Sequence, residues 1–158
     1  MGLAEERFRD HALIVVDMQN DFVRAGAPLE VPEARPTIAV HQRLIAAFRA
    51  ARRPVVFTRF LWTHAPSLLW NWSPVCAPPT KCCWAGHMRH YGDIGTERDC
   101  AGVIDELAPA PGDLVIDKYG YGAFHRTALG PLLRDQGIRS LFITGKMTQI
   151  CVEETARE

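Results

Sequence analysis

The chain has 158 residues, 47% of them apolar and 23% charged, which suits one globular domain with a hydrophobic core. The 18 lysines and arginines balance the 18 aspartates and glutamates, so the net charge predicts neither a nucleic acid nor an anionic membrane surface as a partner. No apolar run is long enough to span a bilayer, and the N-terminal segment lacks the apolar stretch of a secretory signal. Five cysteines without an export signal indicate reduced thiols, so we expect a cytoplasmic protein.

Short β-rich runs alternate with segments that repeat apolar residues at helical spacing. The first run lacks polar alternation, as expected of a strand buried on both faces of a sheet. Strands alternating with helices predict a three-layer α/β/α domain with a parallel, Rossmann-like sheet. The predicted strands are 13–16, 55–58, 114–117 and 141–144, and the predicted helices are 36–52, 127–136 and 150–158.

One long segment, 62–102, has no clear period. It contains all four tryptophans and four of the five cysteines. A loop of this length in a compact domain is usually functional or disordered, and its aromatic content argues against disorder. We therefore interpret it as a lid-like insertion or pocket wall within a single domain spanning 1–158.

Three residues with reactive side chains lie where predicted strands end: Asp17, Lys118 and Cys151. Parallel α/β sheets place their ligand sites at the carboxyl ends of strands, so these residues are expected to meet in one pocket. Each alone also has an ordinary interpretation, as a helix cap, a solvated lysine and a small buried apolar residue. Cys151 begins a predicted helix, whose dipole would favour a thiolate.

Each of the three residues lies in a longer motif. Asp17 opens D-x-Q-x-D-F, Lys118 opens K-x-x-Y-x-A-F-x-x-T-x-L, and Cys151 lies within G-x-x-T-x-x-C-V-x-x-T-A-R. With these motifs in this order, the chain resembles the isochorismatase-like cysteine hydrolase family, which includes nicotinamidases, carbamoylsarcosine amidase and ureidoacrylate amidohydrolase. The resemblance runs from about residue 12 to the end of the chain.

The resemblance implies a Cys–Asp–Lys triad. Asp17 would take the thiol proton and later activate water, Lys118 would hold Asp17 in place, and Cys151 would attack a carbonyl carbon to form a thioester. It also implies a cis peptide bond between Lys146 and Met147, with the backbone N–H groups of Met147 and Cys151 forming an oxyanion hole. We expect aromatic pocket walls at Phe22, Trp62, Tyr121 and Phe124.

The resemblance also bears on cofactors and substrate class. The nicotinamidase branch binds a metal through a D-x-H pair after the second strand, where this chain has Phe60 and Trp62. Neither side chain ligates a metal, so we expect no metal and no cofactor. Because Cys151 is present, we expect hydrolysis of a C–N bond in a small amide, ureide or carbamoyl substrate. The alternative within the family is an isochorismatase-type vinyl-ether hydrolase.

Two interpretations from other classes remain open. The chain could be a catalytically inactive α/β fragment or assembly partner, because family members continue past the nucleophile helix into two further strands; we expect a C-terminally truncated sheet with an exposed edge at 141–144. A homo-oligomer, dimer or tetramer, is expected by resemblance alone.

The Cys/His-rich insertion could instead bind zinc, although it lacks a C-x2-C knuckle and packed thiols are the favoured interpretation. The residues concerned are Cys76, Cys82, Cys83, His87, His90 and Cys100.

Overall fold

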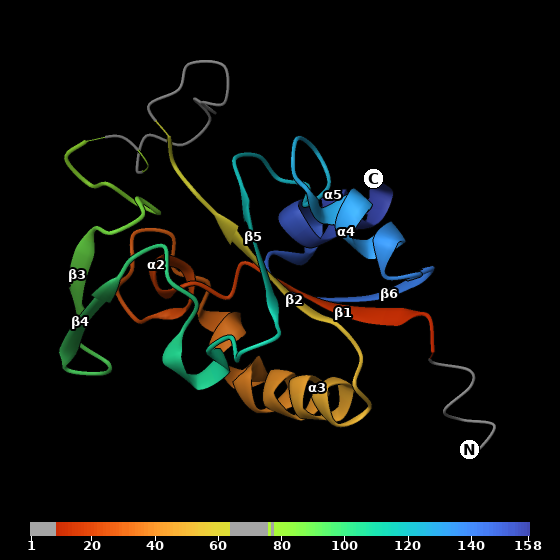
Figure 1. Ribbon diagram of the computed structural model, residues 1–158. Coiled ribbons are helices and arrows are strands. Elements are labelled where there is room, and N and C mark those ends of the chain that lie inside the picture. Colours follow the sequence, from red (N-terminus) through yellow and green to blue (C-terminus); the bar gives the residue numbers. More distant parts are fainter. Residues whose placement is uncertain (1–8, 64–75, 77) are drawn as a thin grey trace.

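The computed structural model describes residues 9–63, 76 and 78–158, and its centre is a parallel β-sheet (Figure 1). All three strand pairings in this sheet are parallel, and the strand order is β5-β2-β1-β6. The α/β class with a parallel sheet is therefore confirmed. The four strands are β1 (His11–Val16), β2 (Val55–Phe60), β5 (Leu114–Lys118) and β6 (Ser140–Gly145).

Helices cover both faces of the sheet, which gives the three predicted layers (Figure 1). Helix α3 (Ile38–Ala50) lies on one face, and helices α4 (Leu129–Asp135) and α5 (Glu153–Arg157) lie on the other. Successive residues of β1 point to opposite faces, so Leu13 packs on the α3 side and Ile14 on the α4 side. Both are fully buried, and each such side chain contributes about 1.5–3 kcal/mol to stability.

The predicted helix at 36–52 is shorter than expected and has a different start. A 3-10 helix, η1 (Pro32–Thr37), precedes α3 and contains Pro36. Proline has no backbone N–H and restricts the residue before it, so regular α-helical bonding begins only after it. The last predicted helix also differs, because it opens with a π-helical turn, η4 (Thr148–Val152), before α5.

The insertion contains secondary structure that the sequence pattern did not predict. Its second half forms an antiparallel hairpin of β3 (Met88–Tyr91) and β4 (Thr96–Asp99). The hairpin is mostly solvated, so it lacks the apolar alternation that marks a half-buried strand. Most of the first half, including Trp70 and Trp72, lies outside the described residues. The short elements α2 (Asn20–Val23) and η3 (Asp105–Leu107) complete the fold.

Strand β6 lies at one edge of the sheet, beside β1, as predicted for the strand at 141–144. Its register pairs Val16 with Gly145, so the ends of both strands open at the same place. Phe142 on this strand is 43% exposed, and its ring centroid lies 5.5 Å from that of Phe48. In the part of the chain that the structure describes, no helix combines the length and apolarity needed to cross a membrane.

Candidate active site

The three residues singled out at strand ends do come together. Asp17 directly follows β1, Lys118 is the last residue of β5, and Cys151 lies in η4, just after β6. Asp17 and Cys151 line one cavity, and Lys118 lies behind Asp17 with none of its surface exposed. The parallel sheet produces this arrangement, because the carboxyl ends of neighbouring parallel strands open on the same edge.

Asp17 is held by two side chains. Nζ of Lys118 lies 2.8 Å from its Oδ2, and the hydroxyl of Thr58 donates a 2.7 Å hydrogen bond to its Oδ1. Lys118 also donates to the carbonyl oxygen of Gly120 at 2.9 Å. Asp17, Lys118 and Thr58 are all at least 99% buried, and a buried carboxylate needs such partners to keep its charge. Sequence reasoning missed Thr58, whose only signal was its place at the end of the strand beside β1.

The surroundings of Lys118 and Cys151 raise the pKa of both groups. Burial by itself would lower the pKa of Lys118, but Asp17 and Cys151 outweigh it, so the ammonium form is favoured. Burial and the nearby Asp17 carboxylate raise the pKa of Cys151 to about 12, against the opposing effect of Lys118 and Lys146. The expectation of a thiolate stabilised by a helix N-terminus therefore does not match the structure. Cys151 is a thiol at neutral pH, next to a carboxylate that can accept its proton.

The cavity has a volume of about 280 Å³ and mostly apolar walls. Two of the predicted aromatic walls, Phe22 and Tyr121, line it. The other two predicted walls, Trp62 and Phe124, do not line this cavity. Trp62 stacks on Trp84 with ring centroids 4.1 Å apart, and Phe124 packs with the core cluster on the α4 side of the sheet. The lining residues are Asp17, Phe22, Pro28, Leu29, Glu30, Val31, Phe60, Tyr121, Lys146, Met147, Ile150 and Cys151.

The loop after β6 brings Lys146, Met147 and Cys151 to the cavity. The predicted cis peptide bond between Lys146 and Met147 is confirmed. The loop leaves β6 at Gly145, whose φ of +114° is a backbone conformation that residues other than glycine rarely adopt. A Cβ there would stand 2.1 Å from the backbone oxygen of Val16, so only glycine lets the two strand ends approach this closely. Lys146 was not predicted as a pocket residue.

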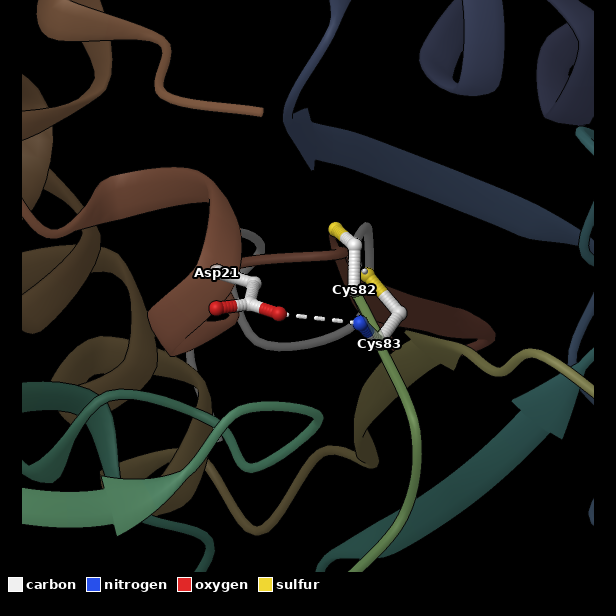
Figure 2. Close-up of side chains that lie close together, drawn as sticks. All are labelled: Asp21, Cys82 and Cys83. Carbon is white, nitrogen blue, oxygen red and sulfur yellow. Dashed lines mark hydrogen bonds between the residues drawn. The ribbon is translucent and has the colours of Figure 1, made fainter. Parts of the chain in front are cut away.

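The cysteines of the insertion form a packed cluster beside Asp21. Figure 2 shows that the Asp21 carboxylate accepts a hydrogen bond from the backbone N–H of Cys83, at 2.9 Å, and not from either thiol. Its other oxygen accepts bonds from Arg89 (2.8 Å) and Tyr91 (2.7 Å). The Sγ atoms of Cys82 and Cys83 are 3.6 Å apart, and burial raises the pKa of Cys83.

Metal ligation by this cluster finds little geometric support. Among residues 9–63, 76 and 78–158, the metal-ligand atoms that gather within 4.8 Å belong to Asp21, Cys82 and Cys83. The other candidate zinc ligands, Cys76, His87, His90 and Cys100, are not part of that group. The carboxylate of Asp21 is already used by three donors, so the cluster fits packed thiols around a structural ion pair better than it fits a zinc site.

Known proteins resemble this chain in sequence over most of its length. A family model described as Isochorismatase domain matches residues 11–158. The ureidoacrylate amidohydrolase RutB of Pseudomonas syringae pv. syringae (strain B728a) is 34% identical over 157 residues, which cover 93% of this chain and 63% of that protein. RutB of Stutzerimonas stutzeri (strain A1501) is 36% identical over 163 residues, covering 93% and 62%. The chain thus spans less than two thirds of the length of these curated relatives.

Solved structures of similar sequence have a similar fold. An isochorismatase family protein from Desulfovibrio vulgaris subsp. vulgaris str. Hildenborough superposes with a TM-score of 0.81 at 30% identity, over 94% of this chain and 73% of that one. The N-carbamoylsarcosine amidase from Thermoplasma acidophilum superposes with a TM-score of 0.70 at 31% identity, over 94% and 74%. The fold of this chain therefore has counterparts among solved proteins.

Proposed function

Because the chain belongs to the isochorismatase domain family, we propose that it hydrolyses a C–N bond of a small amide, ureide or carbamoyl substrate, with Cys151 as the nucleophile. The observation that carries this proposal is that Asp17 and Cys151 line one cavity, with Lys118 paired to Asp17 behind it. Relatives named ureidoacrylate amidohydrolase and N-carbamoylsarcosine amidase support the amide class of substrate.

In the proposed reaction, Asp17 accepts the proton of the Cys151 thiol as Sγ attacks the carbonyl carbon of the substrate. The tetrahedral intermediate collapses when its C–N bond breaks and the leaving nitrogen takes the proton from Asp17, which leaves a thioester on Cys151. Asp17 then removes a proton from water, which attacks the thioester carbonyl; the C–S bond breaks, the acid leaves, and the sulfur of Cys151 takes the proton back from Asp17. The raised pKa of Cys151 suits this sequence, because the thiol loses its proton only when a base removes it.

Lys118 and Thr58 act on Asp17 in this proposal. The ion pair with Lys118 and the hydrogen bond from Thr58 fix both carboxylate oxygens. A general base that is fixed within hydrogen-bonding reach of the proton loses little entropy when the reaction begins. Lys118 also lowers the energy of the thiolate that forms, since its positive charge opposes the rise in the pKa of Cys151.

The backbone N–H groups of Met147 and Cys151 are the proposed oxyanion hole. Both residues line the cavity, and both belong to the loop and helical turn that follow β6. Donors fixed by the backbone stabilise a developing oxyanion without any reorganisation at the moment of reaction. The aromatic rings of Phe22 and Tyr121 are the proposed apolar walls for the substrate. The cavity volume of about 280 Å³ suits a small molecule.

The proposal is tested by replacing the nucleophile. The Cys151→Ala variant is expected to release no ammonia from a panel of small N-carbamoyl and ureido acids that the unchanged chain hydrolyses. Quenching a reaction of the unchanged chain and mapping its peptides by mass spectrometry should give an acyl adduct on Cys151. Unchanged turnover in Cys151→Ala would exclude Cys151 as the nucleophile. A homo-oligomer in the cytoplasm remains a prediction, to be measured by sedimentation and fractionation.

A further inference from the structure

Lys146 is a second buried lysine at the proposed active site. Its side chain is 4% exposed and lines the cavity together with Asp17 and Cys151. Nζ of Lys146 lies 3.3 Å from the centroid of the Phe22 ring, which is a cation–π distance. The ammonium group therefore lies against the apolar wall of the cavity rather than in bulk solvent.

The negative charges that line the cavity already have partners. Asp17 pairs with Lys118 at 2.8 Å. Glu30 pairs with Arg35 at 2.7 Å and accepts a hydrogen bond from the backbone N–H of Gly26 at 2.8 Å. The backbone N–H of Lys146 donates to the carbonyl oxygen of Val16 at 3.0 Å, but across the described residues its ammonium group has neither a hydrogen bond nor an ion pair. The ammonium of Lys146 is therefore a positive charge at the cavity without an ion-pair partner among the described residues. This is unusual, because buried charges in proteins are almost always paired.

The other groups that face Lys146 are thiols. Cys151 approaches from η4, and Cys82 and Cys83 approach from the insertion. Burial lowers the pKa of Lys146 to about 8, although Asp17 and these thiols act in the opposite direction. Lys146 is therefore mostly charged at neutral pH and loses its charge as the pH rises through about 8.

We infer that Lys146 is a specificity-determining residue that forms an ion pair with a carboxylate group on the substrate. The cavity would then select small amides that carry one negative charge over neutral amides of the same size. An ammonium on an apolar wall is well suited to this, because the substrate carboxylate would satisfy a charge that is otherwise unpaired. The inference rests on the proposed function, since it assumes that Cys151 attacks the bound molecule.

A different role for Lys146 would be to stabilise the thiolate of Cys151 without contacting the substrate. The two roles make different predictions for a pair of alkylating reagents. Iodoacetate and iodoacetamide react with a thiolate in the same way: the S–C bond forms, iodide leaves, and the thiol proton goes to solvent. Only iodoacetate carries a carboxylate. The ratio of their rates at Cys151 therefore reports anion recognition, and the thiolate fraction cancels.

The experiment measures both rates at Cys151 by peptide mapping, which separates this thiol from the four cysteines of the insertion. We compare the unchanged chain with Lys146→Met, which keeps the length and apolar stem of the side chain. Lys81→Met is the matched control, because Lys81 lies over the Trp84 ring and does not line the cavity. At pH 7, the iodoacetate-to-iodoacetamide ratio should fall roughly tenfold in Lys146→Met, the effect of one charge-assisted hydrogen bond, and should not change in Lys81→Met.

The unchanged chain supplies a second measurement that needs no variant. Because Lys146 is charged below its pKa, the ratio should fall as the pH rises through about 8. A ratio that is equal in the unchanged chain and Lys146→Met, or that stays flat with pH in the unchanged chain, would overturn the inference and leave the proposed nucleophile intact. If Cys151→Ala hydrolyses the amide panel at the unchanged rate, the proposed function fails and this inference fails with it.

Discussion

Oδ2 of Asp17 lies 2.8 Å from Nζ of Lys118, and both side chains are almost completely removed from solvent. A buried ion pair of this kind is costly to form and more costly to break, because removing one partner leaves an unpaired buried charge. The pair is therefore a fixed feature of the fold, and Cys151 lies against it. The charge of Asp17 has two opposite effects on Cys151, since it raises the pKa of the thiol and provides the base that deprotonates it.

Replacing Asp17 should separate these two effects. In Asp17→Asn, hydrolysis should fall by about 10²–10⁴-fold, the usual contribution of a general base. Alkylation of Cys151 by iodoacetamide at pH 8 should become faster, because loss of the carboxylate lowers the pKa of the thiol. Turnover and peptide-mapped alkylation rates are measured on the same preparation, with circular dichroism as the check of folding. A parallel fall in both rates would show that the carboxylate does not hold the thiol in its protonated form.

The pH dependence of the unchanged chain follows from the same pKa. A thiol with a pKa of about 12 is almost fully protonated from pH 7 to pH 10, so its small thiolate fraction rises about tenfold for each pH unit across that range. Alkylation of Cys151 by iodoacetamide should therefore keep accelerating from pH 7 to pH 10. Stopped reactions followed by peptide mapping give the rate at each pH. A plateau near pH 9 would mean that burial and Asp17 do not raise the pKa of this thiol.

Thr58 should affect catalysis more than stability. Thr58→Val keeps the shape of the side chain but removes the hydroxyl that donates to Oδ1 of Asp17. We expect kcat to fall by roughly tenfold with little change in KM, because one hydrogen bond of about 1–2 kcal/mol to the base is lost. Thr144→Val is the matched control, since its hydroxyl bonds to His41 instead. An equal loss of kcat in both variants would assign the effect to general destabilisation of the sheet.

Gly145 should tolerate no side chain. In Gly145→Ala, the new Cβ would stand 2.1 Å from the oxygen of Val16, at a φ of +114°. We expect the free energy of unfolding to fall by about 3 kcal/mol or more, as measured by urea denaturation. Gly137→Ala separates the two causes, because Gly137 also has a positive φ, +69°, but has nothing within 4 Å of the added atom. That control should lose only about 1 kcal/mol, and equal losses would exclude the contact with Val16 as the cause.

Asp21 should be structural rather than catalytic. Asp21→Asn leaves Arg89 without its buried counter-ion and weakens the bond from Tyr91. The free energy of unfolding should fall by about 3–5 kcal/mol, the cost of breaking a buried ion pair. Asp105→Asn is the control, because its pair with Arg98 is exposed and should contribute little. Specific activity per folded molecule should be unchanged in both variants. Loss of activity at full folding would instead place Asp21 in the reaction.

The sequence by itself determined the order of strands and helices and the residues at the strand ends. β1 can be read from its sequence because a strand buried on both faces has a continuous apolar run, which ends at Val16, just before Asp17. The approximate bounds of β2, β5 and β6 follow from short apolar runs too, although β5 and β6 are edge strands and only partly buried. The β3–β4 hairpin could not be read, because its solvated side chains carry no periodic signal.

Only the tertiary structure decided how those residues act on one another. Thr58 and Lys146 reach the site because β2 and β6 are the two neighbours of β1, and strand order is a long-range property that a local pattern does not contain. Burial set the direction of the pKa of Cys151 against the expectation from its helix position, because desolvation depends on what packs around the thiol and not on its neighbours in sequence. In the same way, packing placed Phe22 and Tyr121 at the cavity and turned Trp62 and Phe124 elsewhere.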